Sequence, residues 1–267
     1  MKYLITFLIL LAAVFWIYFK LMSLFKGREP QKTVKQPKNN IADIIKSYIK
    51  NGNCQQNPRL VYSSLIPENG VDEYPKGLKM WTEAGDIYYF SKNPVELNTC
   101  AGMFANTSFS EIDLSGFDTK NVNDMTSMFA NCSNLENVYF GDNFNTKKVT
   151  SMSRMFLNCN KISFLDLNSF NTSQVTTMEE MFAGCKVLES LNLSKFETSK
   201  VDNMSKMFYD CEMLKKVIAS EKFDVSFVKK SDLMFERCIE LSDVNKLTDK
   251  TFAKIDTPNS RGYFIKE

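Results

Sequence analysis

Residues 170–193 read FNTSQVTTMEEMFAGCKVLESLNL, and the same pattern recurs before and after them along the chain. Six Met-Phe pairs mark its phase, with steps of 25, 27, 26, 26 and 27 residues: Met103-Phe104, Met128-Phe129, Met155-Phe156, Met181-Phe182, Met207-Phe208 and Met234-Phe235. A repeat of this length predicts a solenoid, because each unit buries its apolar face only by stacking on its neighbours.

The first half of each unit has helical spacing. Val175, Met178 and Phe182 recur at positions that share one helical face. Thr176 with Glu179 three residues later has the spacing of a capping box, which predicts that a short helix starts there. A Thr column before it, at 119, 146, 172 and 198, is expected to bond the backbone of the turn before each helix.

The second half of each unit predicts a short strand. Leu188, Leu191 and Leu193 give L-x-x-L-x-L, whose last three positions alternate between inward and outward. Identical strands one unit apart are expected to pair in parallel. The fold class predicted is therefore an α/β repeat solenoid, a leucine-rich-repeat-like stack of short parallel strands and short helices, preceded by one transmembrane helix.

The repeat resembles that of BspA-like leucine-rich-repeat surface proteins, in the variant common in mycoplasmas. The residues that carry the resemblance are the stretches Phe170–Val175 and Phe196–Val201 with the later stretches Met181–Cys185 and Met207–Cys211. The resemblance covers about residues 97–246. It implies a surface-displayed binding or adhesion module and not an enzyme.

The composition excludes several kinds of site. The chain has 267 residues, a net charge of +2 at pH 7 and no histidine. A balanced charge does not favour nucleic acid as a partner. Without histidine, Ser-His-Asp catalysis and His-ligated metal sites are excluded. No catalytic residue, cofactor or metal site is expected.

An apolar stretch opens the chain. Residues 3–19 are almost all apolar, and the run continues past Lys20 to residue 25. About 20 apolar residues cross a bilayer as a helix, so residues 1–26 are expected to form a transmembrane anchor. A cleaved signal peptide is the alternative; its apolar stretch would be shorter, and no small-x-small cleavage site ends this one.

The orientation of this anchor stays open. Only the N-terminus and Lys2 precede the span, whereas five lysines and one arginine follow it between residues 20 and 38. The positive-inside rule therefore favours a cytoplasmic C-terminal portion, while the resemblance implies display at the cell surface. We expect a single-pass membrane protein with its repeats on the outside.

Five segments follow from this interpretation. They are the anchor 1–26, a polar linker 27–40, an N-terminal cap region 41–96, about six repeats of about 26 residues over 97–246, and a C-terminal cap 247–267. Asn40, at the end of the linker, is expected to start a helix that Gly52 ends, and Trp81 is expected to fill the interior of the cap.

The seven cysteines form no C-x-x-C and no zinc spacing. Five of them follow the Phe of a repeat by three residues, at 132, 159, 185, 211 and 238, and are expected to form an inward column. Side chains in stacked parallel strands point the same way, which keeps the sulfurs from disulfide geometry. We expect small, buried, reduced thiols.

The candidate ligand face lies between the fixed columns. Its predicted members are outward strand positions: Asp113, Asn137, Tyr139, Phe164, Asp166, Ser190, Asn192, Lys216 and Ile218. Tyr139 and Phe164 are the expected aromatic anchors, since the core does not need apolar side chains there. A merely solvated sheet is the alternative.

Two functions remain open from the sequence. One is a membrane-anchored binding and adhesion module that recognises a protein or another host macromolecule. The other is a membrane-tethered cytoplasmic scaffold for protein–protein interaction, favoured by the lysines after the span and by thiols that stay reduced inside cells.

Overall fold

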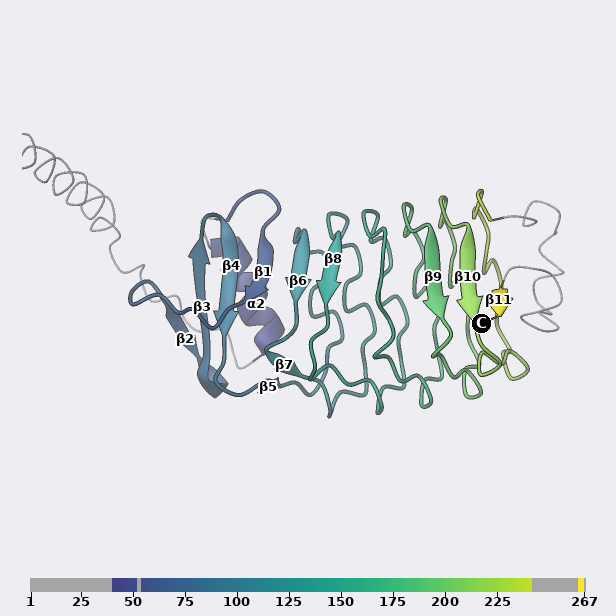
Figure 1. Ribbon diagram of the computed structural model, residues 1–267, viewed down its shortest axis with the longest axis horizontal. Coiled ribbons are helices and arrows are strands. Elements are labelled where there is room, and N and C mark those ends of the chain that lie inside the picture. The colour runs from purple at the N-terminus through teal and green to yellow at the C-terminus, as the bar shows by residue number, and fades with distance from the viewer. Residues whose placement is uncertain (1–39, 52–53, 242–263, 267) are drawn as a thin grey trace, which may run out of the picture. The chain divides into compact units, whose positions relative to one another are not determined.

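The computed structural model describes residues 40–51, 54–241 and 264–266. In this part of the chain a helix and a group of strands are followed by a parallel β-solenoid of about six turns (Figure 1). The predicted solenoid is therefore confirmed. The expected anchor and nearly all of the expected linker lie outside the described residues. Among the helices that are described, none has the length and apolarity to cross a membrane.

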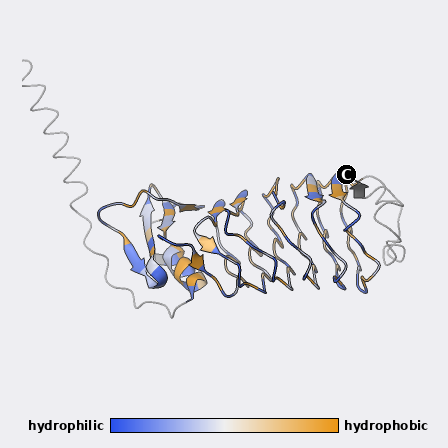
Figure 2. Ribbon diagram, turned by 60° about the horizontal axis from the view of Figure 1, so that its bottom comes forward, coloured by the Kyte–Doolittle hydropathy of each residue, from blue (hydrophilic) through white to orange (hydrophobic). Residues whose placement is uncertain are grey.

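The described elements are short. They are α2 (Ile41–Asn51), β1 (Arg59–Tyr62), β2 (Asp72–Tyr74), the 3-10 helix η1 (Pro75–Gly77), β3 (Leu78–Glu83), β4 (Asp86–Phe90), β5 (Val95–Glu96), β6 (Glu111–Asp113), β7 (Phe117–Asp118), β8 (Asn137–Tyr139), β9 (Ser190–Leu193), β10 (Lys216–Ala219) and β11 (Phe264–Lys266). Most of each rung consists of turns and of chain outside the strands. Figure 2 shows hydrophobic and hydrophilic segments alternating along it.

The strands of successive rungs pair in parallel, as the repeat predicts. One sheet has the order β2-β3-β4-β1-β6-β8, and a second has the order β11-β10-β9. Ile112 in β6 lies between Leu60 of β1 and Val138 of β8 in register. In the second sheet Ile218 of β10 pairs with Asn192 of β9. Equivalent repeat positions therefore lie above one another.

Helix α2 covers the N-terminal end of the core. Its first turn is capped by Asn40, whose Oδ1 accepts a hydrogen bond from the amide of Ala42 at 3.0 Å. The side chains of Ile41, Ile44 and Ile45 are buried in the cluster that continues through the rungs. A stack needs such a cover, because its first rung would otherwise expose its apolar side.

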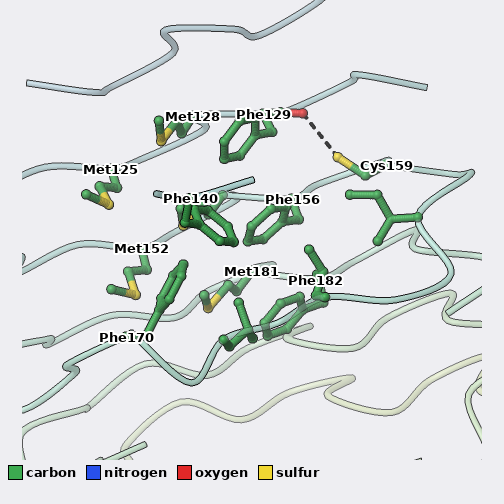
Figure 3. Packing of buried hydrophobic residues seen from close by; sticks show 14 of the residues in the cluster. Met125, Met128, Phe129, Phe140, Met152, Phe156, Cys159, Phe170, Met181 and Phe182 are labelled. Atoms are coloured by element: carbon green, nitrogen blue, oxygen red, sulfur yellow. Dashed lines mark hydrogen bonds between the residues drawn. The ribbon is translucent and has the colours of Figure 1, made fainter. Parts of the chain in front are cut away.

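A file of stacked phenylalanine rings runs through the interior (Figure 3). Neighbouring ring centroids lie 5.1 to 5.8 Å apart, and the ring planes differ by 4 to 12°. The members are Phe104, Phe129, Phe156, Phe182, Phe208 and Phe235, all buried. The rungs are thus stacked in the register that the Met-Phe columns predict.

The short helices predicted in each repeat are wrong. Residues 97–241 contain no helix; the segment from Met125 to Cys132 is a chain of tight turns. Its amides alternate in partner: Phe129 N–H donates to Met155 of the next rung, and Ala130 N–H donates to Ser127, three residues back. Ser127 and Asn131 have positive φ. Contact with the next rung therefore replaces the i→i−4 bonds of a helix.

The capping box predicted at Thr176 is wrong for the same reason. The hydroxyl of Thr176 donates to the carbonyl of Thr150, which lies in the preceding rung. The predicted bonds of the Thr column also reach between rungs. Thr172 Oγ1 donates to Glu197 O at 2.9 Å and accepts from Glu197 N–H at 2.8 Å. These buried hydroxyls join neighbouring rungs and do not cap their own turn.

The cysteine column is buried and unpaired, as predicted. All seven cysteines are free thiols. The Sγ of Cys159 lies 3.2 Å from the carbonyl of Phe129 in the preceding rung, as the dashed line in Figure 3 shows, and Cys185 bonds Phe156 in the same way. Burial raises the pKa of Cys185 to about 12, so this thiol stays protonated at neutral pH.

We expect thiol titration to separate burial from oxidation. Denatured, unreduced protein should give close to seven reactive thiols with a disulfide reagent. Native protein should react first at Cys54, the cysteine that is not fully buried. A titre of one or two thiols in the denatured protein would show that cysteines pair and would contradict this geometry.

A buried carboxylate ties the N-terminal strands together. Asp86 Oδ2 accepts from Arg59 Nε and Nη2 at 2.9 and 2.6 Å, and its Oδ1 accepts from the Arg59 amide and from Gln55. Burial opposes ionisation of this carboxyl, but the bonds from Arg59 and Gln55 outweigh it and lower the pKa of Asp86.

Replacing Asp86 should change how the free energy of unfolding depends on pH. Because the folded-state pKa lies below the unfolded value of about 4, ionised Asp86 stabilises the fold above that pH. The contribution is lost as the pH falls through the folded-state pKa. We expect Asp86→Asn to lower the free energy of unfolding by about 1–3 kcal/mol at pH 7. The difference should shrink in urea titrations at pH 3, and an equal difference at both pH values would contradict the assignment.

Candidate functional site

The candidate ligand face is the outward side of the strand rows. Seven of its nine predicted members are exposed: Asn137, Tyr139, Phe164, Asp166, Ser190, Asn192 and Lys216. Asp113 and Ile218 are half-buried. The strand residues between them point inward; Ile112, Leu191 and Val217 are buried. The predicted alternation of inward and outward positions therefore holds where strands form.

Three polar members of the face have a structural role. Asp113, Asp166 and Asn192 each accept a hydrogen bond, through Oδ1, from the amide two residues later, at 2.9 to 3.0 Å. Such Asx turns end the strand segment and turn the chain toward the next side of the rung. These residues shape the edge of the face, and only their second oxygen or their amide nitrogen remains for a ligand.

Tyr139 and Phe164 are the exposed aromatics of the face. The two residues have exposed fractions of 52% and 67%. Asn137 precedes Phe164 by 27 residues, the same step that separates the stacked rings of Phe129 and Phe156. Tyr139 and Phe164 are thus diagonal neighbours on adjacent rungs. On regularly paired strands this offset would put their Cα atoms about 8 Å apart. They match the aromatic anchors that the sequence predicts.

Charges near the aromatic pair are arranged in pairs between rungs. Lys161 Nζ lies 3.8 Å from Glu136, and Lys215 Nζ lies 3.0 Å from Glu189. Exposed ion pairs of this kind contribute little stability. The charges directly beside Tyr139 are acidic, since Asp113 of β6 pairs with it and Asp166 follows it in the next rung, so the face disfavours anionic ligands.

The predicted strand around Leu165 does not form. Residues 162–167 form no strand and belong to none of the sheets, although Leu165 and Leu167 are buried. Within the described residues, the backbone of 163–166 makes no backbone hydrogen bond to β8 or β9. The turn side of the same rung stays bonded, with Phe156 N–H donating to Met181 at 2.9 Å. The strand rows are interrupted where the two aromatics are exposed.

Hydrogen exchange should report this interruption directly. We expect the amides of residues 163–166 to exchange much faster than those of Phe156 and Phe182, because the latter donate to the next rung. Mass spectrometry of peptides covering 158–169 and 178–188 measures the contrast. Equal protection of the two peptides would mean that the strand rows are continuous.

The sequence prediction missed other exposed apolar side chains. Leu65 lies in the segment between β1 and β2, and Phe227, Ile239 and Met213 lie in the last described rungs. Phe227 occupies a column that holds Asn121, Lys148, Gln174 and Lys200 in earlier rungs, so comparing the repeats could have found it. None of the four belongs to the strand face.

No three metal-ligating side chains come together in the described parts of the chain. The polar side chains that do lie close together form hydrogen bonds and ion pairs between neighbouring rungs. The face can therefore offer aromatic contact, amide and hydroxyl hydrogen bonds, and unpaired backbone groups.

Comparison with known protein families gives one match. The family is described as Mycoplasma protein of unknown function, DUF285, and it matches residues 91–163 and 136–250. Together the two matches span more than half of the chain. The chain belongs to the DUF285 family. The DUF285 matches overlap over 136–163, as expected for a pattern built from repeats, and they include every residue of the candidate face. No curated protein and no solved structure matches the chain.

Proposed function

We propose that this DUF285 protein is a non-catalytic binding and adhesion module, anchored to a membrane by residues 1–26. Its strand face would recognise a protein or another host macromolecule outside the cell. The observation that carries the proposal is the exposure of Tyr139 and Phe164 on a face whose inward neighbours already fill the core. Exposed aromatics in a polar rim are the usual anchors of binding surfaces, and extended faces are where repeat proteins bind.

The resemblance to BspA-like leucine-rich-repeat surface proteins supports surface display. It rests on the M-F-x-x-C columns and the F-x-T-S-x-V stretches, which here form the interior of the stack. A cytoplasmic scaffold is the second candidate, favoured by the positive charges that follow the apolar stretch and by seven free thiols.

Protease treatment of intact cells separates the two locations. Surface display predicts that an added protease degrades the repeats while cytoplasmic markers survive. Full protection of the repeats until the cells are lysed would overturn surface display and favour the scaffold.

The binding face is tested by comparing two forms of the full-length chain. Immobilised wild-type protein and the double variant Tyr139→Ser/Phe164→Ser are exposed to the same host-matrix extract, and the captured material is quantified by mass spectrometry. We expect the specifically captured material to be lost with the double variant and retained by Phe227→Ser, which removes an exposed Phe elsewhere. Equal capture by all three forms would overturn the assignment of the face.

A further inference from the structure

The interruption of the strand rows coincides with a large buried side chain. Phe140 occupies an inward column that holds Leu114, Leu167 and Leu193 in other rungs. Its ring lies 4.6 Å from that of Phe144. It meets Phe170 of the next rung edge-on at 5.0 Å, and both of these rings are labelled in Figure 3. A phenyl ring between rungs needs more room than leucine does. We attribute the missing bonds between β8 and residues 163–166 to this ring.

The interruption of the strand rows changes which groups the surface presents to a ligand. In a continuous parallel sheet the backbone N–H and C=O groups are used between strands, and only side chains remain for a ligand. Here the backbone groups of residues 163–166 bond no neighbouring rung in the described structure, and Ser163, Phe164 and Asp166 are exposed. Unpaired backbone donors and acceptors therefore lie beside two exposed aromatic rings.

The side chains around the aromatic pair are uncharged or acidic, because Asp113 of β6 pairs with Tyr139 and Glu111 pairs with Asn137. Asn137 lies before Tyr139 on β8, and Ser163, Ser190 and Asn192 lie on the following rungs. Amides and hydroxyls both donate and accept hydrogen bonds. The nearby Lys161 is paired with Glu136. A ligand matched to this surface has an apolar face for the rings, a rim of groups that donate and accept, and no negative charge, which the carboxylates of Asp113 and Asp166 would repel.

We propose that the Tyr139–Phe164 surface binds a neutral glycan. A pyranose ring has an apolar C–H face that packs on an aromatic ring, and its hydroxyls both donate and accept hydrogen bonds. This inference rests on the proposed binding function and names the ligand class for the same face.

A folded protein partner fits this face less well. Stable protein interfaces bury about 800 Å² on each partner around an apolar centre. Here the outward positions around the two aromatics are polar on every side: Asn137, Asp166, Ser190, Asn192 and Lys216. Two rings in a polar surround match a small, hydroxyl-rich ligand better than a large apolar patch.

The test is direct titration of the full-length chain in a detergent without a sugar headgroup. The neutral probes are N-acetyllactosamine, chitotetraose and maltotetraose, and the charged probes are sialyllactose and a heparin tetrasaccharide. Binding is followed by calorimetry and by saturation-transfer NMR. We expect at least one neutral probe to bind more tightly than both charged probes. Tyr139→Ser and Phe164→Ser should each weaken it about tenfold, and Phe227→Ser should leave it unchanged.

The outcomes separate the two proposals. If none of the neutral probes binds, or if Tyr139→Ser and Phe164→Ser both bind as wild type does, the glycan inference is overturned. If the double variant nevertheless loses capture of a protein from the host extract, the proposed binding function stands with a protein ligand. If the face variants change neither glycan binding nor capture, both proposals fail. Because Phe164 and Tyr139 are exposed, unchanged thermal unfolding confirms that each variant is folded.

Discussion

Replacing Phe156 with alanine should lower the free energy of unfolding by about 3–5 kcal/mol. Phe156 is fully buried between Phe129, at a centroid distance of 5.2 Å, and Phe182, at 5.8 Å. Alanine would leave a ring-sized cavity and remove both stacking contacts. The cavity cannot collapse easily, since backbone hydrogen bonds on the turn side fix the spacing of these rungs.

The matched control is Phe164→Ala in the same repeat. Phe164 is exposed, so its truncation should change the free energy of unfolding by no more than about 0.5 kcal/mol. Urea titrations followed by far-UV circular dichroism compare the two variants with wild type. Similar losses of stability in both variants would mean that the stacked phenylalanine rings do not contribute the stability that their burial implies.

The second large effect is expected at Gly116, where the first rung meets the N-terminal strands. A Cβ built on Gly116 would lie 2.6 Å from Cε2 of Tyr89 and 2.8 Å from Cδ2 of Tyr62. The Tyr89 hydroxyl also donates to Asp113 O at 2.8 Å and accepts from the Gly116 amide at 3.1 Å. Any side chain at Gly116 therefore displaces a buried ring and two hydrogen bonds.

Gly116→Ala should cost about 2–3 kcal/mol, within the range found for overpacked cores. Ser115→Ala is the neighbouring control, because the Ser115 hydroxyl makes no hydrogen bond in the described structure, and we expect it to be nearly neutral. Thermal unfolding of both variants provides the comparison. Wild-type stability of Gly116→Ala would mean that Tyr62 and Tyr89 can move aside, contrary to their packing.

The sequence predicted the stack because its columns are set by burial. Met, Phe, Val and Cys recur at fixed steps, and each column lies in the core. The register of the rungs follows from the steps alone, as the stacked rings of Phe129, Phe156 and Phe182 confirm. Because the unit repeats, each copy gives separate evidence for the same buried position.

The helices could not be predicted correctly from this pattern. The spacing of Val175, Met178 and Phe182 suits one helical face, but it equally suits tight turns that present the same side chains inward. What decides between them is where the amides donate. In the structure alternate amides reach the next rung, which a helix does not allow, and positive φ at residues such as Glu180 makes room for this.

The candidate face was predicted in outline but not in detail. Exposure of Tyr139 and Phe164 followed from strand alternation. The turn-capping role of Asp113, Asp166 and Asn192 did not, because an Asx turn depends on the backbone two residues later. The interruption at residues 163–166 was not predicted either, although Phe140, in a column that holds Leu114 and Leu167 in neighbouring rungs, is a sequence signal for it.

The account depends on the rings of successive repeats touching in sequence order. Aromatic NOE spectroscopy on phenylalanine-labelled protein measures this most directly. It should show cross-peaks between Phe129 and Phe156, between Phe156 and Phe182 and between Phe182 and Phe208, whose centroids lie 5.2 to 5.8 Å apart. Absence of these cross-peaks would contradict the stacked solenoid and the candidate face that depends on it. Cross-peaks from these rings to solvent-exposed residues in their place would contradict it as well.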